Sequence, residues 1–461
     1  MKIKTMFFCL LAVILLISSV AVDAANVPES RPLGNEPWSK EFVDSYPNAK
    51  VGTHVSIAHH PLNGKAYISY YDAVNGDLWL AYQVSPGTGN CHGNNDWKCV
   101  LVDSEGDVGQ FSSIDVTYVT QFQLSITIIG IAYHDATNRA LKFADYRENR
   151  MPPWRISTLD APLTSTGSRG TYASMKFDNN NVPVIGYHTQ DTYGIVGAVK
   201  IASRVGADGT GCNGGSPDWS CEIIDSAQGN IDFGTHVSID INWLNNANVA
   251  FFNSVDNSLD FARPVASGTG SCSNNYWNCI TVDQGPGRGK YISIYAKKSL
   301  QDRTRFAYYD QSEGKIRYAY SVSGTGNCTN SGFNCYWVDE VGTFNGHFGL
   351  SMAVDDQGLP IIAYMEGLGE EAPIRLRIAR PRSAYGENYG NCGEEQDMFL
   401  IWTCKTLDSY GDTDMAEYVG VSLNPAGLAT VAYSVDFHLD DQTFLRVAEQ
   451  HFKIYLPLIN K

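Results

Sequence analysis

An aromatic residue is followed six positions later by aspartate in the stretch Trp97-Lys98-Cys99-Val100-Leu101-Val102-Asp103. The same spacing occurs seven times along the 461-residue chain. The pairs are Trp38/Asp44, Trp97/Asp103, Trp154/Asp160, Trp219/Asp225, Trp277/Asp283, Phe333/Asp339 and Trp402/Asp408. A signature that returns at a near-constant interval indicates a repeat architecture.

Three further segments recur between successive copies of this signature. The first reads Gly52-Thr53-His54-Val55-Ser56-Ile57 in one copy, and the second ends in Tyr70-Tyr71-Asp72. All are short, rich in Val, Ile, Tyr and Phe, and bounded by Gly, Asn or Asp, which is the pattern of β-strands. Four strands in each of seven units predict an all-β fold, a seven-bladed β-propeller of four-stranded antiparallel blades.

The two ends of the repeat predict how the ring closes. The segment Trp38 to Asp44 has no preceding strands, and the seventh repeat, about 416–450, lacks its fourth strand. Pairing them completes the last blade and covers a strand edge; the alternative fourth strand is the C-terminal run Phe452 to Ile459. We therefore expect a propeller over residues 38–451, an N-terminal extension at 25–37 and a C-terminal tail at 452–461.

The first residues predict the compartment. Lys2 and Lys4 precede an apolar run over residues 6–22, and small residues before Ala25 suit a cleavage site, so residues 1–24 are predicted to be a secretory signal peptide. No other segment has the ~20 consecutive apolar residues needed to cross a bilayer. We expect a secreted protein, extracellular or on the cell surface.

Ten cysteines remain after Cys9 leaves with the signal peptide, and an even count in an exported chain predicts disulfides. They fall into the local pairs Cys91–Cys99, Cys212–Cys221, Cys272–Cys279, Cys328–Cys335 and Cys392–Cys404. The later cysteine stands two residues after the aromatic of the signature. Where Lys40 or Ile156 takes that position the partner is missing too, so each bridge is expected to staple one repeat.

The formal net charge of −16 argues against a nucleic-acid partner. It also disfavours strongly anionic polysaccharides unless a local patch reverses the field. We expect a monomer that holds no metal or cofactor, since a metal between His54 and His236 would have to span three blades.

The signature, the strand pattern and the local cysteine pairs resemble those of secreted bacterial β-propellers built from degenerate repeats, of the sialidase-like and lectin-like kind. The resemblance covers Trp38 to Gln450 and concerns the fold. The sialidase Asp-box, Ser-x-Asp-x-Gly-x-x-Trp, is absent, as are an evident arginine triad and the Asp-rich calcium loops of integrin-type propellers.

In propellers the start of the innermost strand and the end of the second strand usually open on one face. The predicted ligand-binding residues there are His54, Phe111, Tyr172, His236, Tyr291 and Tyr418 from first strands, and Tyr71, Asp72, His134, Asp135, His188, Tyr309 and Asp310 from second strands. Aromatic rings stack on sugars, and carboxylates and imidazoles bond their hydroxyls. The aromatics repeated in every copy, such as Tyr70, are expected in the blade core.

These residues favour a binding module for carbohydrate at the channel mouth. One alternative is a carbohydrate-active enzyme on the same face: a lyase with His134, His188 and Tyr172 as acid and base, or a hydrolase with two of Asp72, Asp135 and Asp310. A structural or protein-binding surface component is the other alternative. Fold alone does not separate them, because function belongs to sites.

Overall fold

The computed structural model describes residues 37–163, 167–190, 196–228, 233–343, 348–367, 374–381, 390–394, 402–409, 418–437 and 441–451. The predicted signal peptide and C-terminal tail lie outside these residues. No helix able to cross a membrane occurs within the described ranges.

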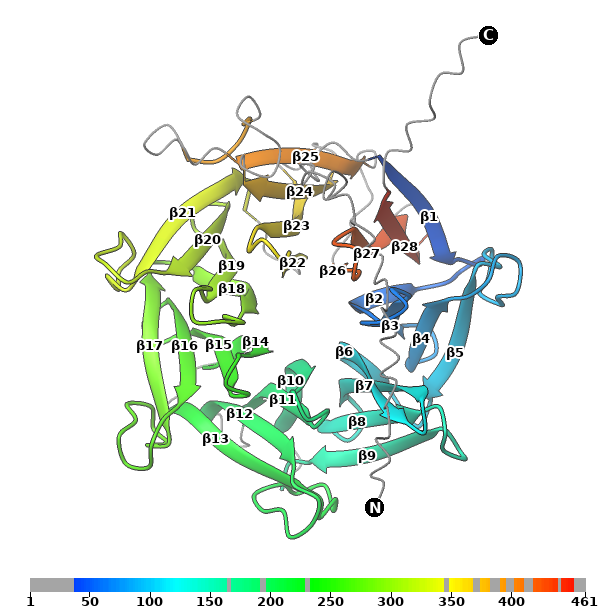
Figure 1. The fold of residues 1–461 in the computed structure, drawn as a ribbon, viewed down its shortest axis with the longest axis horizontal. Coiled ribbons are helices and arrows are strands. Elements are labelled where there is room, and N and C mark those ends of the chain that lie inside the picture. Colours follow the sequence, from blue (N-terminus) through cyan, green and yellow to red (C-terminus); the bar gives the residue numbers. More distant parts are fainter. Residues whose placement is uncertain are drawn as a thin grey trace, which may run out of the picture.

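Seven four-stranded antiparallel sheets are arranged as blades in a ring, which confirms the predicted propeller (Figure 1). From innermost to outermost strand, the first blade is β2 (Val51–His59), β3 (Ala66–Asp72), β4 (Asp77–Gln83) and β5 (Trp97–Asp103), and the second is β6 (Val108–Gln121), β7 (Leu124–Asp135), β8 (Ala140–Arg147) and β9 (Trp154–Asp160). The third blade is β10 (Ser168–Phe177), β11 (Pro183–Gln190), β12 (Val196–Arg204) and β13 (Trp219–Gln228), and the fourth is β14 (Thr235–Ile241), β15 (Ala247–Asn253), β16 (Ser258–Pro264) and β17 (Trp277–Gln284). The fifth blade is β18 (Arg288–Tyr295), β19 (Arg305–Asp310), β20 (Lys315–Ser321) and β21 (Phe333–Glu340), and the sixth is β22 (Leu350–Val354), β23 (Pro360–Glu366), β24 (Arg375–Pro381) and β25 (Trp402–Ser409). Every outermost strand begins at the aromatic residue of the signature.

The seventh blade joins the two ends of the described chain. Its strands are β26 (Val419–Leu423), β27 (Ala429–Phe437), β28 (Gln442–Gln450) and β1 (Trp38–Asp44). β1 pairs with β28 antiparallel, with Trp38 opposite Gln450. The N-terminal closing strand is therefore confirmed; the alternative, Phe452 to Ile459, lies outside the described residues.

The aspartate of the signature ties each blade to the next. At six of the seven junctions it accepts a hydrogen bond from a fully buried tyrosine on the second strand of the following blade, over 2.6–2.8 Å. The pairs are Asp44/Tyr70, Asp103/Tyr133, Asp160/Tyr187, Asp283/Tyr308, Asp339/Tyr364 and Asp408/Tyr433. At the seventh junction Phe251 stands where the others have tyrosine, facing the blade that carries Asp225.

A belt of serines links the innermost strands around the axis. Six serines each accept a hydrogen bond from a backbone N–H of the following blade over 3.0–3.2 Å; they are Ser56, Ser113, Ser174, Ser238, Ser293 and Ser351. Gly420 takes the seventh position, where a Cβ would lie 3.1 Å from Ile57 Cγ2. The small residues expected from crowding thus also bond neighbouring blades.

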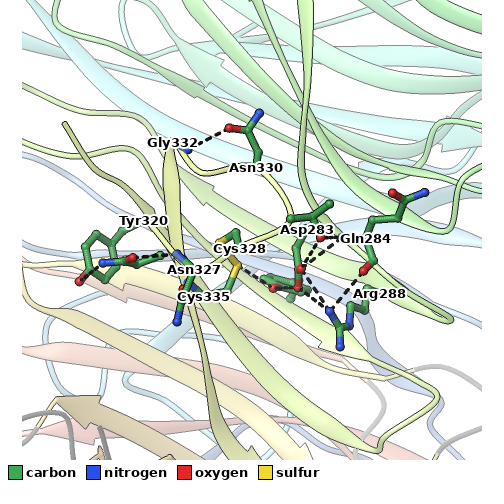
Figure 2. Close-up of a disulfide and its surroundings, with 12 residues drawn as sticks. Asp283, Gln284, Arg288, Tyr320, Asn327, Cys328, Asn330, Gly332 and Cys335 are labelled. Carbon is green, nitrogen blue, oxygen red and sulfur yellow. Dashed lines mark hydrogen bonds and ion pairs between the residues drawn. A yellow bond between two sulfur atoms is a disulfide. The ribbon is translucent and has the colours of Figure 1, made fainter. Parts of the chain in front are cut away.

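All five predicted disulfides are present, which confirms the cysteine pairing. Each closes a loop within its own blade, as expected. Figure 2 shows Cys328–Cys335 beside Asn327, whose side-chain oxygen accepts from the Cys335 N–H over 2.6 Å. The same loop reaches the preceding blade, since the Asn330 N–H donates to the Val282 carbonyl over 3.3 Å. The stapled loops therefore also help to join neighbouring blades.

Candidate ligand site at the channel mouth

Seven aromatic rings, one from each blade, surround a cavity of about 190 Å³ on the propeller axis. This aromatic collar consists of His54, Phe111, Tyr172, His236, Tyr291, Phe348 and Tyr418. Phe348 is buried and the other six are partly exposed. The six first-strand residues predicted from the sequence thus meet around one cavity.

A local backbone irregularity aims five of these rings at the axis. His54, Phe111, Tyr172, His236 and Tyr291 all have φ between 50° and 54°, in the left-handed region. The strand register shifts at each of them, as in a β-bulge, which redirects a side chain.

The glycine two positions before each of these rings makes the bulge possible. At Gly52, for example, φ is 97° and a Cβ would lie 2.8 Å from the Leu445 Cα. A left-handed residue other than glycine costs about 1–2 kcal/mol. Strain of this kind gathers at functional sites, so its recurrence in five blades marks the collar as a candidate site.

The rings of the collar pack against one another at regular steps. Centroids lie 4.4 Å apart for Tyr418–His54, 4.8 Å for His54–Phe111, 4.9 Å for Phe111–Tyr172, 4.7 Å for Tyr172–His236, 4.4 Å for His236–Tyr291 and 5.7 Å for Tyr291–Phe348. The corresponding interplanar angles run from 46° to 61°. They lie near the step of about 51° that separates the blades of a seven-fold ring, as expected for ring planes parallel to the axis.

The spacing limits how the rings can be turned. If all the faces looked inward, carbons of adjacent rings would come well inside the ~3.5–4.0 Å contact distance. The rings are therefore tilted, so that each packs against its neighbours as well as lining the cavity.

A second layer of side chains lies behind the collar. Ring centroids are 5.9 Å apart for Tyr71 and His54, 6.3 Å for His134 and Phe111, 6.1 Å for His188 and Tyr172, 6.3 Å for Phe252 and His236, and 6.3 Å for Tyr309 and Tyr291. None of the five outer members lines the cavity. They support the collar from the second strands of the first five blades.

The two histidines proposed as acid and base belong to this outer layer. His134 is 6% exposed, its Nδ1 lies 2.8 Å from the Arg169 carbonyl oxygen, and burial lowers its pKa. His188 is 4% exposed, and its Nδ1 lies 2.8 Å from the Thr171 hydroxyl. The collar therefore stands between these imidazoles and the cavity.

The three predicted carboxylates are the last residues of β3, β7 and β19, where they cap the following turns and do not line the cavity. Asp72, Asp135 and Asp310 are 0–2% exposed. Asp72 accepts from the Val74 N–H over 2.9 Å and Asp135 from the Asn138 N–H over 2.8 Å. Asp310 pairs with Arg317 at 2.8 Å and with Arg288 at 3.1 Å. The structure thus places these carboxylates away from the cavity, with oxygens that bond turn N–H groups and, in Asp310, two arginines.

Two aromatic residues escaped sequence reasoning. Phe348 stands three residues before the small residue of its strand, Ser351, whereas the other collar residues stand two before theirs. That one-residue offset hides it in an alignment of the repeats. Phe252 belongs to the outer layer, and the pattern of the second strands, an aromatic following the core aromatic, was the available signal.

The channel holds a second cavity of about 490 Å³, whose lining includes the serine belt itself. It is lined by charged groups, including Asp115 with Lys176 at 3.8 Å and Asp240 with Lys298 at 2.7 Å. His59 also lines it, and burial lowers the pKa of this imidazole to about 4. The Phe177 N–H donates to Asp115, so part of this charge serves to bond neighbouring blades.

No family model and no curated protein matches the sequence. Several solved propellers are similar in structure. A fucose-specific lectin from Aleuria aurantia matches with a TM-score of 0.42 and 10% identity, over 79% of this chain and 98% of that chain. The polysaccharide lyase Uly1 matches with a TM-score of 0.43 and 9% identity, over 90% and 93%. The NanB sialidase from Streptococcus pneumoniae matches with a TM-score of 0.39 and 11% identity, over 92% and 71%. These low identities show a similarity of fold alone.

Proposed function

We propose that this protein is a binding module that holds one terminal sugar residue of a glycan in the aromatic collar. The observation that carries the proposal is the convergence of seven rings on a single cavity of about 190 Å³. An apolar cavity of about 150 Å³ holds one benzene molecule. The space therefore suits one six-membered ring and excludes a chain of them.

The lining of the cavity suits a sugar more than an apolar ring. Hydroxyls belong to Tyr172, Tyr291 and Tyr418, and imidazoles to His54 and His236, whereas Phe111 and Phe348 offer only carbon. A mostly apolar lining with a few polar groups that fix orientation is typical of small-ligand sites. Tyrosine and histidine both donate and accept hydrogen bonds, as sugar hydroxyls require.

The placement of the titratable groups favours binding over catalysis. The candidate carboxylates cap turns at the ends of β3, β7 and β19, and His134 and His188 lie behind the collar. An acid or base has to come within hydrogen-bond reach of the atom it serves. Of the acid and base candidates only Tyr172 lines the cavity, and among the described lining residues there is no pair of carboxylates of the kind a glycosidase uses.

We also propose that the protein is exported, with residues 1–24 as its signal peptide. Five disulfides support this, because such bonds form and persist in oxidising compartments. Mass spectrometry of the secreted protein should show an N-terminus at Ala25 and ten oxidised cysteines. Retention of residues 1–24 would contradict the proposed export.

The test is a glycan panel on the mature chain, read for binding and for new reducing or unsaturated ends. Tyr172→Phe keeps the collar ring and removes its hydroxyl, and should weaken binding about five- to tenfold, the effect of one hydrogen bond. Tyr276→Phe is the matched control, because Tyr276 is 52% exposed and does not line the cavity. Equal affinity in both variants, or release of product, would contradict the proposal.

A further inference from the structure

We propose that one glycan chain occupies both cavities of the channel, with its terminal sugar in the aromatic collar and its next residues in the second cavity. This inference rests on the proposed function and specifies its ligand as a neutral, unbranched oligosaccharide. Three features of the channel support it: the contact between the two cavities, the size of the second, and the polar groups that line it.

The two cavities adjoin each other along the propeller axis. They share seven lining residues, one from each blade, which follow the collar residues in sequence by one position or, in the sixth blade, by two. This shared ring consists of Val55, Ser112, Ala173, Val237, Ile292, Leu350 and Val419. Because the cavities meet at this ring, an extended ligand can reach from one into the other.

The second cavity continues away from the collar along the innermost strands. Side chains two residues apart on a strand lie on the same face, so the positions two after the serine belt form a third ring. It consists of Ala58, Asp115, Lys176, Asp240, Tyr295, Ala353 and Ser422, and all of them line the second cavity. Lys176 and Lys298, at this end, have side chains that are 41% and 45% exposed. The cavity therefore reaches solvent on the side away from the collar, where a chain can leave it.

The two volumes set the length of the ligand. An apolar cavity of about 150 Å³ holds one six-membered ring, and the collar cavity has about 190 Å³. The second cavity, with about 490 Å³, is more than twice as large. It has space for about two further sugar residues by the same measure, so the whole channel suits a trisaccharide.

The serine belt offers hydrogen-bond donors to these residues. Each of its six hydroxyls accepts a backbone N–H and still has its own proton to donate. Ser293 donates to the Met352 carbonyl over 3.4 Å. Within the part of the chain that the structure describes, the other five have no such acceptor, and all six line the second cavity. Five hydroxyl protons are therefore available to sugar oxygens.

The third ring adds a donor and an acceptor that lie close together. The Lys176 ammonium carries three N–H donors, and its Nζ lies 3.8 Å from Asp115 Oδ1, further than a hydrogen bond. The other oxygen of Asp115 accepts from the Phe177 N–H over 2.9 Å. A sugar hydroxyl both donates and accepts, so it can bridge Lys176 and Asp115.

The charges of the second cavity indicate a neutral ligand. Its lining carries two carboxylates, Asp115 and Asp240, and two ammonium groups, Lys176 and Lys298. His59 adds no charge at neutral pH, because burial lowers its pKa to about 4. The lining therefore has no net charge. A polyanion would in addition be repelled by the field of a chain whose formal net charge is −16.

The experiment is calorimetry on the disulfide-bonded mature chain with neutral sugars of increasing length. The series are glucose, cellobiose and cellotriose; mannose, mannobiose and mannotriose; and xylose, xylobiose and xylotriose. In the series that binds, each added residue up to the trisaccharide should tighten binding about five- to tenfold, the effect of about one hydrogen bond.

The variant Ala353→Phe tests whether the added residues lie in the second cavity. Ala353 lines that cavity and not the collar, and its replacement fills space without removing a side-chain hydrogen bond. The monosaccharide affinity should stay unchanged while the gain with length disappears. Ala426→Phe is the matched control, because Ala426 is exposed in the turn after β26 and lines neither cavity. Its gain with length should equal that of the wild type.

Lys176→Met is the second variant, and it leaves the channel open. Methionine keeps most of the length of the side chain and removes its three donors. The trisaccharide should bind about three- to tenfold more weakly, the effect of about one hydrogen bond, with no change for the monosaccharide. Thermal melts check that all three variants are folded.

The outcomes separate this inference from the proposed function. Equal affinity for the three members of every series that binds would overturn the inference and leave a site for one sugar residue in the collar. A gain with length that survives in Ala353→Phe would also overturn it, because the chain would then leave the collar on the other side. Absence of binding to every sugar, with a folded protein, would overturn both.

Discussion

The hydroxyl of Tyr308, on β19 of the fifth blade, donates to Asp283, on β17 of the fourth, over 2.6 Å. The Tyr308 oxygen also lies 3.6 Å from Cys335 Sγ in the fifth blade's disulfide. One hydroxyl thus contacts the signature aspartate and the disulfide that follow from the sequence repeat. The same hydrogen bond between tyrosine and aspartate recurs at five other junctions, so the aspartate of the repeated signature is a residue that bonds adjacent blades.

Tyr308→Phe should lower the free energy of unfolding by about 1.5–3 kcal/mol, the value of a hydrogen bond to a charged group. The ring stays in place, so the loss reports the hydroxyl. Urea unfolding measures it, with Tyr276→Phe as the exposed control. A change within 0.5 kcal/mol of the control would show that this bond contributes little to the ring, a threshold set by ordinary surface substitutions.

Phe251→Tyr is the reverse substitution, at the junction that lacks the hydroxyl. Asp225 there accepts from the Ser273 N–H over 2.9 Å and lies 3.4 Å from Cys279 Sγ. A new hydroxyl should add about 1 kcal/mol of stability by the same bond. Thermal unfolding is the measurement. Destabilisation would mean that this junction is too closely packed to admit the oxygen.

Lys142 and Asp103 form a buried ion pair across the first junction, 2.6 Å apart and each at most 6% exposed. Lys142→Met should cost about 3–5 kcal/mol, because it leaves the buried Asp103 carboxylate with the Tyr133 hydroxyl but without its cation. Adding Asp103→Asn should recover part of that loss. Denaturant titration of the two variants is the check, and a double variant no more stable than the single one would contradict the pairing.

Glu449 makes the closing blade sensitive to pH. Burial, with a contribution from Glu41, raises the pKa of Glu449 to about 7. Between pH 4.5 and 7 the folded protein retains a proton that the unfolded chain has released, so stability falls as the pH rises through this window. Between pH 5 and 8 the wild type should lose about 1–3 kcal/mol more than Glu449→Gln. Parallel pH profiles of stability for the two proteins would contradict this prediction. His59, whose pKa is lowered to about 4, makes stability rise with pH, but it is present in both proteins and cancels in the comparison.

The sequence predicts the scaffold well because each of its signals is local. A strand begins at each of Trp38, Trp97 and Trp154, and β1 closes the ring as the unpaired segment indicates. The site is predicted only in part. The sequence pattern around Asp72 is the same for an aspartate that caps a turn and for one that contacts a ligand. Phe348 is one residue out of register with the other repeats, and the sequence alone does not indicate that its ring still reaches the collar. The convergence of the collar rings on one cavity depends on the closure of seven blades, which no single repeat encodes.

The decisive measurement for a sugar residue held on the axis by the collar is a crystal structure of the mature chain with its tightest-binding monosaccharide. We expect one ligand per chain, with its ring inside the collar and its polar groups within hydrogen-bond distance of Tyr172, His236 or Tyr418. A ligand between blades, on the stapled outer loops, or in several equivalent pockets would contradict it.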